Sequence, residues 1–177
     1  RVGLLAHRMS LMAVFFIVSV GLSAIVHRVL YPERVATIFP IFSVQILVSL
    51  AAVAMARVER LRARLVATTA VVALLLIWLA DLYLVRVGSP LEELAFTVVG
   101  LVAGASVALP WTWWAQLVVA AGALLGLAVS APLLTTTMNP ISLGVSVVAL
   151  AVLTVVATFD VDRYRYQAFA QALVQRG

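Results

Sequence analysis

A single carboxylate stands inside an apolar run of this sequence, Asp81 within residues 78–82 (Trp-Leu-Ala-Asp-Leu). A charged side chain inside an apolar helix marks a ligand or proton site by default. On a helix, however, Arg86 lies only about 7.5 Å further along the axis. We therefore expect Asp81 to reach the outer interface, where it snorkels or pairs with an arginine, and we keep a ligand or proton site as the alternative. The nearest arginines in the predicted arrangement are Arg28, Arg34 and Arg86.

Gln45 and Ser49 form a second polar pair, one helical turn apart near the middle of another apolar run. An amide at that depth needs a hydrogen-bond partner, so both side chains should face other helices rather than lipid. We expect them to hold helices together, with each contact contributing on the order of 1 kcal/mol. A pocket for a small polar ligand is the alternative interpretation.

The remaining candidates for chemistry are few. His7 and His27 would lie about 30 Å apart on one helix, so they cannot ligate one haem iron together, and we expect them to anchor the helix at the interfaces. The sequence has no Cys, no glycine-rich phosphate loop and no hydrolase or metalloprotease motif. It also has no His/Cys/carboxylate cluster for a metal and no chain of intramembrane carboxylates. The sequence therefore predicts a non-catalytic segment without a metal or another cofactor.

The elements that position these side chains belong in a bilayer. From Leu94 to Phe159 the sequence has no Asp, Glu, Lys or Arg, and no water-soluble domain could hide such a stretch. Apolar residues make up 65% of the chain and charged residues 11%, against about 25% in soluble domains. The net charge of +5 comes from arginines that flank apolar runs. We interpret them as topology signals and not as a nucleic-acid-binding patch.

Turn signals divide the apolar sequence into six predicted helices, at about 9–26, 37–56, 65–85, 94–109, 114–134 and 141–159. Pro40 either opens or kinks the second helix, and Arg86 with Gly88 ends the third. Ser89-Pro90-Leu91-Glu92 has the pattern of a capping box for the fourth helix. Asn139-Pro140 is expected to cap the sixth.

Arginine counts orient this predicted bundle, because cytoplasmic connections of membrane proteins carry the excess of basic residues. Six spans place both termini on one side. Only Arg28, Arg34 and Arg86 lie on the other side, whereas nine of the 12 arginines lie with the termini. The densest group among the nine is Arg57, Arg60, Arg62 and Arg64. We therefore predict an all-α, multi-pass protein of the bacterial cytoplasmic membrane with both termini in the cytoplasm.

This layout divides the chain into two parts. Residues 1–160 form the six-helix transmembrane bundle, and residues 161–177 continue the sixth helix as a cytoplasmic helical extension of about 25 Å. Tyr166, Phe169 and Leu173 recur there at helical spacing. We expect this extension to link the bundle to a further domain.

Glycine pairs and tryptophans mark the fourth and fifth predicted helices. The pairs Gly100/Gly104 and Gly122/Gly126 fall on neighbouring antiparallel helices, and Gly100 and Gly122 lie at nearly equal depth, so we expect the two backbones to approach closely there. The connection between the two helices carries Trp111, Trp113 and Trp114. These tryptophans match an interfacial aromatic belt, and contact with a quinone or pigment is the alternative.

Three groups of residues carry a resemblance to a class of bacterial proteins. They are Leu30-Tyr31-Pro32-Glu33, Leu109-Pro110-Trp111 with Gln116, and Asp162-Arg163-Tyr164-Arg165 with Phe169. In these groups and in its layout the chain resembles the six-helix N-terminal membrane regions of bacterial signalling proteins, which precede histidine kinase, diguanylate cyclase or nucleotide cyclase domains. The resemblance implies a sensor or anchor whose sixth helix passes motion or dimer geometry to a cytoplasmic domain beyond this sequence.

Three functions remain open at this point. The first is the sensor or anchor module, acting as a homodimer. The second is an accessory subunit of a larger respiratory or photosynthetic membrane complex, which suits the small residues and short connections. The third is a small-molecule or lipid-binding carrier, which would need a polar cavity around Gln45 or Asp81. All three have the lipid bilayer as a partner, and none involves nucleic acid.

Overall fold

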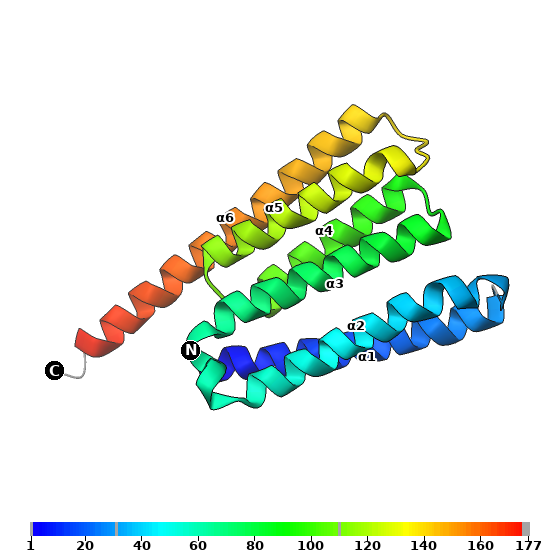
Figure 1. Cartoon of the computed structure of the whole chain (residues 1–177). Helices are drawn as coiled ribbons and strands as arrows, with labels where there is room; N and C mark the ends of the chain where they lie inside the picture. Colours follow the sequence, from blue (N-terminus) through cyan, green and yellow to red (C-terminus); the bar gives the residue numbers. More distant parts are fainter. Residues whose placement is uncertain (1, 31, 110, 175–177) are drawn as a thin grey trace.

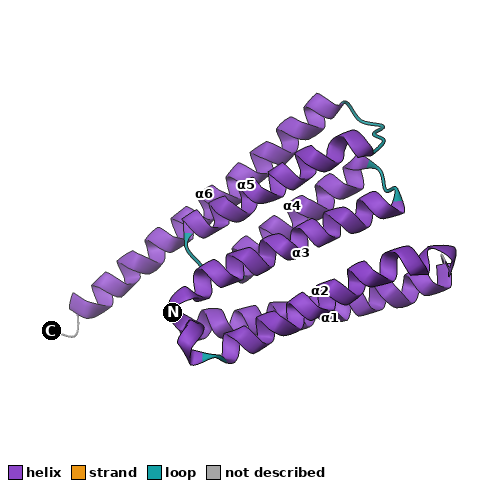
Figure 2. Cartoon of the chain, in the orientation of Figure 1, coloured by secondary structure: helices purple, strands orange, loops and turns teal. Residues whose placement is uncertain are grey.

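The computed structural model describes residues 2–30, 32–109 and 111–174, and this part of the chain is helical with short connections and no strand (Figures 1 and 2). All six α-helices are long and apolar enough to cross a membrane. The predicted all-α fold with six such helices is therefore confirmed. The helices are α1 (Val2–Leu30), α2 (Val35–Arg57), α3 (Leu65–Val87), α4 (Leu91–Ala108), α5 (Trp113–Ser130) and α6 (Pro140–Val174).

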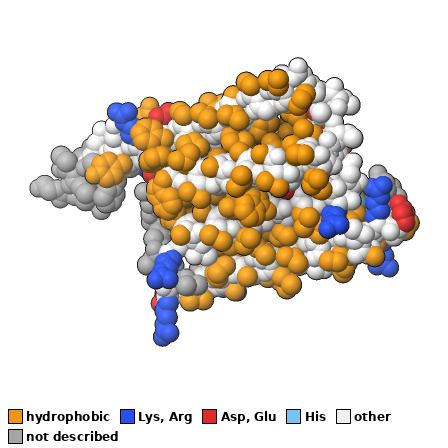
Figure 3. Space-filling view, turned by 45° about the horizontal axis from the view of Figure 1, so that its top comes forward, with side chains coloured by type: hydrophobic (Ala, Val, Ile, Leu, Met, Phe, Trp, Pro, Cys, Tyr) orange, Lys and Arg blue, Asp and Glu red, His pale blue; other side chains and the backbone are white. Residues whose placement is uncertain are grey.

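Successive helices run in alternating directions, so the bundle has two ends (Figure 1). The arginine-rich end contains the start of α1, the α4–α5 connection and the 3-10 helix η2 (Glu59–Arg64). Arg57, Arg60, Arg62 and Arg64 all belong to this end, in η2 or in the last turn of α2. The opposite end contains η1 (Pro32–Arg34), the α3–α4 turn and the α5–α6 connection with η3 (Ala131–Leu133). Between the two ends, hydrophobic side chains cover the face drawn in Figure 3.

The helices pack as a hairpin beside a four-helix group. α1 packs mainly on α2, whereas α3 contacts α2 on one side and α4 and α5 on the other. α6 packs on α4 and α5. Small and branched side chains such as Leu94, Val98, Ala115 and Ala123 fill the core of this group. α3 is therefore the helix that joins the two halves of the protein.

Local sequence signals fix several helix ends. α2 already begins at Val35, so Pro40 lies inside the helix and does not open it. α3 ends at Gly88, whose φ of 74° is open to glycine at little steric cost. The backbone N–H of Ser89 then donates to the carbonyl of Leu84 at 3.1 Å, which closes the helix end. The prediction for the end of α3 is confirmed.

The predicted capping box at the start of α4 is wrong. Pro90 occupies the N-cap position, and no described side chain caps the helix. Glu92 instead turns its carboxylate to the α5–α6 connection, where backbone N–H groups need an acceptor. The predicted cap of α6 is confirmed, because Oδ1 of Asn139 accepts a hydrogen bond from the N–H of Ile141 at 2.9 Å.

α6 is a single helix of 35 residues and continues past the other helices at the arginine-rich end (Figure 1). The expectation that the sixth helix runs on without a break is confirmed as far as Val174. Tyr164 and Tyr166 are exposed on this extension. The side chains of Phe169 and Leu173, which carry the rest of the predicted helical pattern, lie outside the described residues.

Candidate functional site

Gln45 and Ser49 lie on the buried face of α2, as predicted from their depth in an apolar run. The hydroxyl of Ser49 donates to the carbonyl of Gln45 at 2.8 Å, so this bond stays within α2. The side-chain oxygen Oε1 of Gln45 is buried and accepts no hydrogen bond from the described residues. The pair therefore faces other helices, but these bonds do not tie α2 to them.

Asp81 lies on the face of α3 that meets α5, with 3% of its surface exposed. Both carboxylate oxygens are buried and have no hydrogen-bond partner among the described residues. The predicted ion pair with an arginine is therefore wrong for the described part of the chain. Arg34 instead donates to the carbonyl of Val87 at 2.6 Å. The physical reason is that Asp81 points sideways to α5 and not along α3 towards Arg86 in the last turn of that helix.

The glycines explain how Asp81 is accommodated. A Cβ added at Gly126 would lie 2.6 Å from Oδ2 of Asp81 and 3.0 Å from Cδ1 of Trp78, and one at Gly122 would lie 2.6 Å from Cδ1 of Leu74. The absence of a side chain at these two positions lets Leu74, Trp78 and Asp81 lie against the backbone of α5. The Gly122–Gly126 pair thus packs on α3.

Gly100 and Gly104 of α4 have a different role. No described atom lies within 4 Å of a Cβ built at either position. The prediction that the two glycine pairs bring α4 and α5 together is therefore wrong. Gly100 and Gly104 instead leave open space beside α1, where they line an apolar cavity.

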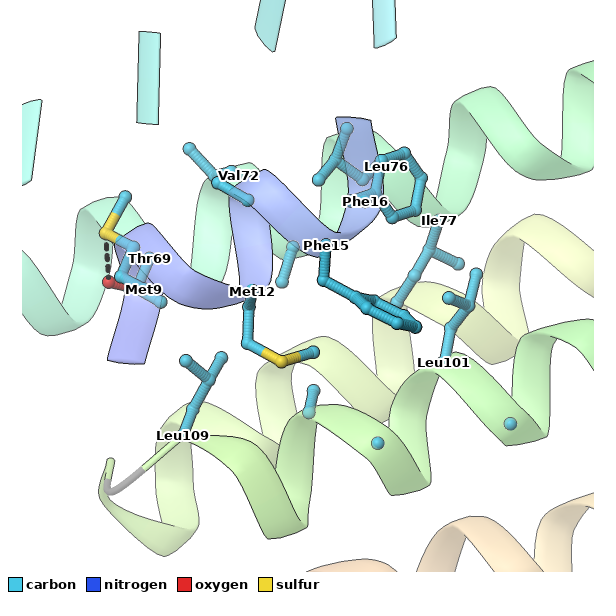
Figure 4. A pocket seen from close by; sticks show the side chains of 15 residues that line it. Met9, Met12, Phe15, Phe16, Thr69, Val72, Leu76, Ile77, Leu101 and Leu109 are labelled. Carbon is cyan, nitrogen blue, oxygen red and sulfur yellow. Dashed lines mark hydrogen bonds between the residues drawn. The ribbon is translucent and has the colours of Figure 1, made fainter. Parts of the chain in front are cut away.

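This apolar cavity lies between α1, α3 and α4 and has a volume of about 220 Å³. Met12 and Phe15 point into it from α1, towards Leu101 of α4 (Figure 4). Its one hydroxyl, on Thr69, already donates to the carbonyl of Leu65 at 2.7 Å and contacts Sδ of Met9 at 3.1 Å. An enclosed apolar space of roughly 150 Å³ is large enough for benzene. The cavity can therefore accommodate an apolar group, but it offers no free polar atom for chemistry.

A second hollow is the α3–α5 groove, which has a volume of about 370 Å³. It is lined by Trp78, Asp81, Leu82, Val85, Leu125 and Gly126 together with residues near the end of α5. The indole Nε1 of Trp78 donates to the carbonyl of Gly122 at 2.9 Å, which fixes the ring across the two helices. Of the polar side chains singled out in the sequence, Asp81 lines this groove, whereas Gln45 and Ser49 do not.

Sequence reasoning missed the polar network around Gln116. Its Oε1 accepts a hydrogen bond from Nε1 of Trp111 at 3.1 Å, and its Nε2 donates to the carbonyl of Val102 at 3.0 Å and to Oγ1 of Thr154 at 3.3 Å. This fully buried amide joins α4, α5 and α6. The sequence did indicate a buried polar contact at this position, because Gln116, like Gln45, is an amide inside an apolar helix.

The hydrogen bonds of Gln116 also show that the predicted aromatic belt does not include Trp111. Trp111 is only 1% exposed and so cannot meet lipid headgroups, whereas Trp113 and Trp114 are 40% and 46% exposed. The prediction for Trp111 is wrong because its N–H finds a partner inside the bundle. Trp113 and Trp114 have the exposure that a belt requires.

His27 belongs to a half-buried aromatic cluster near the end of the bundle that lies opposite the arginine-rich end. Its Nδ1 donates to the carbonyl of Ser23 at 2.9 Å, and its Nε2 shares a hydrogen bond with the hydroxyl of Tyr83. The ring of Phe42 packs against both His27 and Tyr83. The cluster joins α1, α2 and α3.

Glu92 clamps the α5–α6 connection to the start of α4. One carboxylate oxygen accepts hydrogen bonds from the hydroxyl of Thr136 at 2.7 Å and from the N–H groups of Thr137 at 2.6 Å and Met138 at 2.8 Å. A second bond joins the same segments, from the N–H of Leu91 to the carbonyl of Thr135 at 2.8 Å. The connection that precedes α6 is therefore held in one conformation.

Because Glu92 holds the α5–α6 connection, we expect Glu92→Gln to have a local effect on that connection. The amide removes the negative charge that strengthens these bonds, so the backbone N–H groups of Thr137 and Met138 should exchange faster with solvent. Hydrogen exchange followed by mass spectrometry in detergent micelles measures the change over residues 135–139. Glu93→Gln, at the neighbouring exposed position, is the control and should leave this exchange unchanged. Equal exchange in both variants would contradict the clamp.

No group of three or more His, Cys, Asp or Glu that could hold a metal ion occurs in the part of the chain that the structure describes. The chain matches no protein-family model, and no curated protein and no solved structure is significantly similar to it. The bundle itself is thus the basis for assigning a function.

Proposed function

We propose that this chain is a non-catalytic module of the bacterial cytoplasmic membrane that senses or anchors, and that α6 transmits its state to a cytoplasmic effector. The observation that carries the proposal is the continuity of α6. This helix begins at the clamped α5–α6 connection, packs on α4 and α5, and leaves the bundle without a break as far as Val174. A continuous helix couples its two ends, because a tilt or rotation at one end moves the other.

The charge distribution supports the orientation in this proposal. α6 leaves the bundle at the arginine-rich end, on the same side as Arg57, Arg60 and Arg64. By the positive-inside rule this end faces the cytoplasm. The extension of α6 would then reach the compartment in which kinase or cyclase domains work.

The extension also has a surface suited to a second copy of the chain. Tyr166 is 76% exposed on this helix. Large apolar and aromatic side chains exposed on a helix outside the membrane favour association with another helix. We therefore place the dimer contact of the sensor on the extension.

Cysteine cross-linking of the full chain in native membranes tests the proposal. The sequence has no Cys, so each introduced cysteine is the only one. Tyr166→Cys, Phe169→Cys and Leu173→Cys follow the helical spacing predicted from the sequence and should form disulfide-linked dimers efficiently. Gln167→Cys and Gln171→Cys fall outside that spacing and serve as matched controls that should cross-link several-fold less.

Two results would contradict the proposal. Equal cross-linking at all five positions would show that the extension is not an ordered dimer contact. Cross-links to other membrane proteins in place of a second copy would favour the accessory-subunit hypothesis.

A further inference from the structure

Asp81 is a buried acid without a partner, and the structure places it in the α3–α5 groove. Both of its oxygens lack a hydrogen bond from the described residues, although 97% of the side chain's surface is covered. A buried carboxylate is costly unless a cation or a hydrogen-bond donor compensates it. The groove that Asp81 lines leaves about 370 Å³ beside it. This space is available for a compensating group from outside the chain.

Trp78 adds a second feature that favours a positive charge. It lies three residues before Asp81 on α3, and both side chains line the groove. The hydrogen bond from its Nε1 to the carbonyl of Gly122 at 2.9 Å holds the indole in place. An aromatic ring together with a carboxylate is the combination that recognises ammonium groups, because both attract a cation.

Apart from Ser130, the rest of the groove is apolar. Leu82, Val85, Leu125 and Val129 line it between Asp81 and the end of α5. An ion with a tightly held water shell gains nothing from such walls, whereas a hydrocarbon chain does. The lining therefore selects for a molecule with a charged head and an apolar tail.

We propose that the α3–α5 groove binds an ammonium group that carries an apolar chain, with the ammonium between Asp81 and Trp78 and the chain along Leu82, Val85, Leu125 and Val129. Two sources have this chemistry, a free lipophilic amine and the headgroup of phosphatidylethanolamine. The site lies on α3 and α5, so it does not depend on the role proposed for α6.

The glycine at position 126 provides a variant that closes the site while leaving Asp81 in place. The added Cβ in Gly126→Ala would meet Oδ2 of Asp81 at 2.6 Å and Cδ1 of Trp78 at 3.0 Å. Gly100→Ala is the matched control, because a Cβ at that position meets no described atom within 4 Å. Asp81→Asn removes the charge and keeps the shape.

The experiment uses the full chain in nanodiscs of phosphatidylglycerol, a lipid without an ammonium group. Tetradecyltrimethylammonium is titrated in, with tetradecanol as the neutral analogue, and the Tm is followed by tryptophan emission. We expect a saturable rise in Tm with the ammonium compound and none with the alcohol. Asp81→Asn and Gly126→Ala should weaken this binding on the order of tenfold or more, whereas Gly100→Ala should retain it.

A parallel titration with phosphatidylethanolamine distinguishes the two sources. A saturable rise in Tm that Asp81→Asn abolishes would assign the site to the lipid headgroup, and its absence would assign the site to a free amine. The proposal is overturned if the ammonium compound and the alcohol act alike, or if Asp81→Asn binds as tightly as the unchanged chain. Should Asp81→Asn fail to fold, full binding by Gly126→Ala would overturn the proposal in the same way.

Discussion

Trp111→Ala is expected to lower the free energy of unfolding by about 3–5 kcal/mol, the range for truncating a large buried aromatic side chain. Trp111 is 1% exposed and packs in the core of the four-helix group. Its removal leaves a cavity and also leaves Oε1 of Gln116 without the donor at 3.1 Å. Both effects act at the point where α4, α5 and α6 meet.

The matched control for this prediction is Trp114→Ala. Trp114 is three residues further along the chain and is 46% exposed, so its truncation opens no interior cavity. We expect this change to cost less than about 1 kcal/mol. Reversible unfolding in mixed detergent micelles measures both values. Similar losses for the two variants would show that Trp111 is not the interior anchor described above.

Gly122→Val is expected to destabilise the protein by about 1–3 kcal/mol through overpacking between α3 and α5. A Cβ at this position would lie 2.6 Å from Cδ1 and 2.9 Å from Cδ2 of Leu74. The Leu74 side chain must therefore shift away from α5 to make room for the valine. The same unfolding measurement gives the size of the effect.

Gly104→Val is the control for the packing of Gly122. It introduces the same side chain into a helix, but a Cβ at Gly104 meets no described atom within 4 Å and lies beside the apolar cavity. We expect little loss of stability, because valine has a better helix propensity than glycine by a few tenths of a kcal/mol. A larger loss at Gly104 than at Gly122 would mean that the glycines face different neighbours from those described here.

The number of helices and some of their ends were predictable from the sequence. Long uncharged runs define the six helices, and Gly88 and Asn139 act on the backbone within a few residues of themselves. The helix lengths predicted from the sequence were less accurate. α1 extends from Val2 to Leu30, well beyond the predicted 9–26, because a charge ends an apolar run but does not end a helix.

The partners of Asp81, Gly100 and Trp111 were not predictable, and there is one physical reason. A helix that is apolar all round gives no signal of which side is buried against protein and which side meets lipid. The sequence therefore shows the depth of a residue in the membrane but not the direction in which it points. Asp81 was expected to point along α3 to the arginines, and it points sideways to Gly126. The same ambiguity led to the wrong neighbours for Gly100 and Gly104.

The uninterrupted length of α6 gives it the properties of a lever. Its 35 residues span about 52 Å at 1.5 Å each. A rigid rod of that length, pivoting near Asn139 by about 5°, displaces its far tip by roughly 4–5 Å, close to one helical pitch. In the proposed function, a motion too small to disturb the packing at the clamped end would become a displacement that a neighbouring protein surface can register.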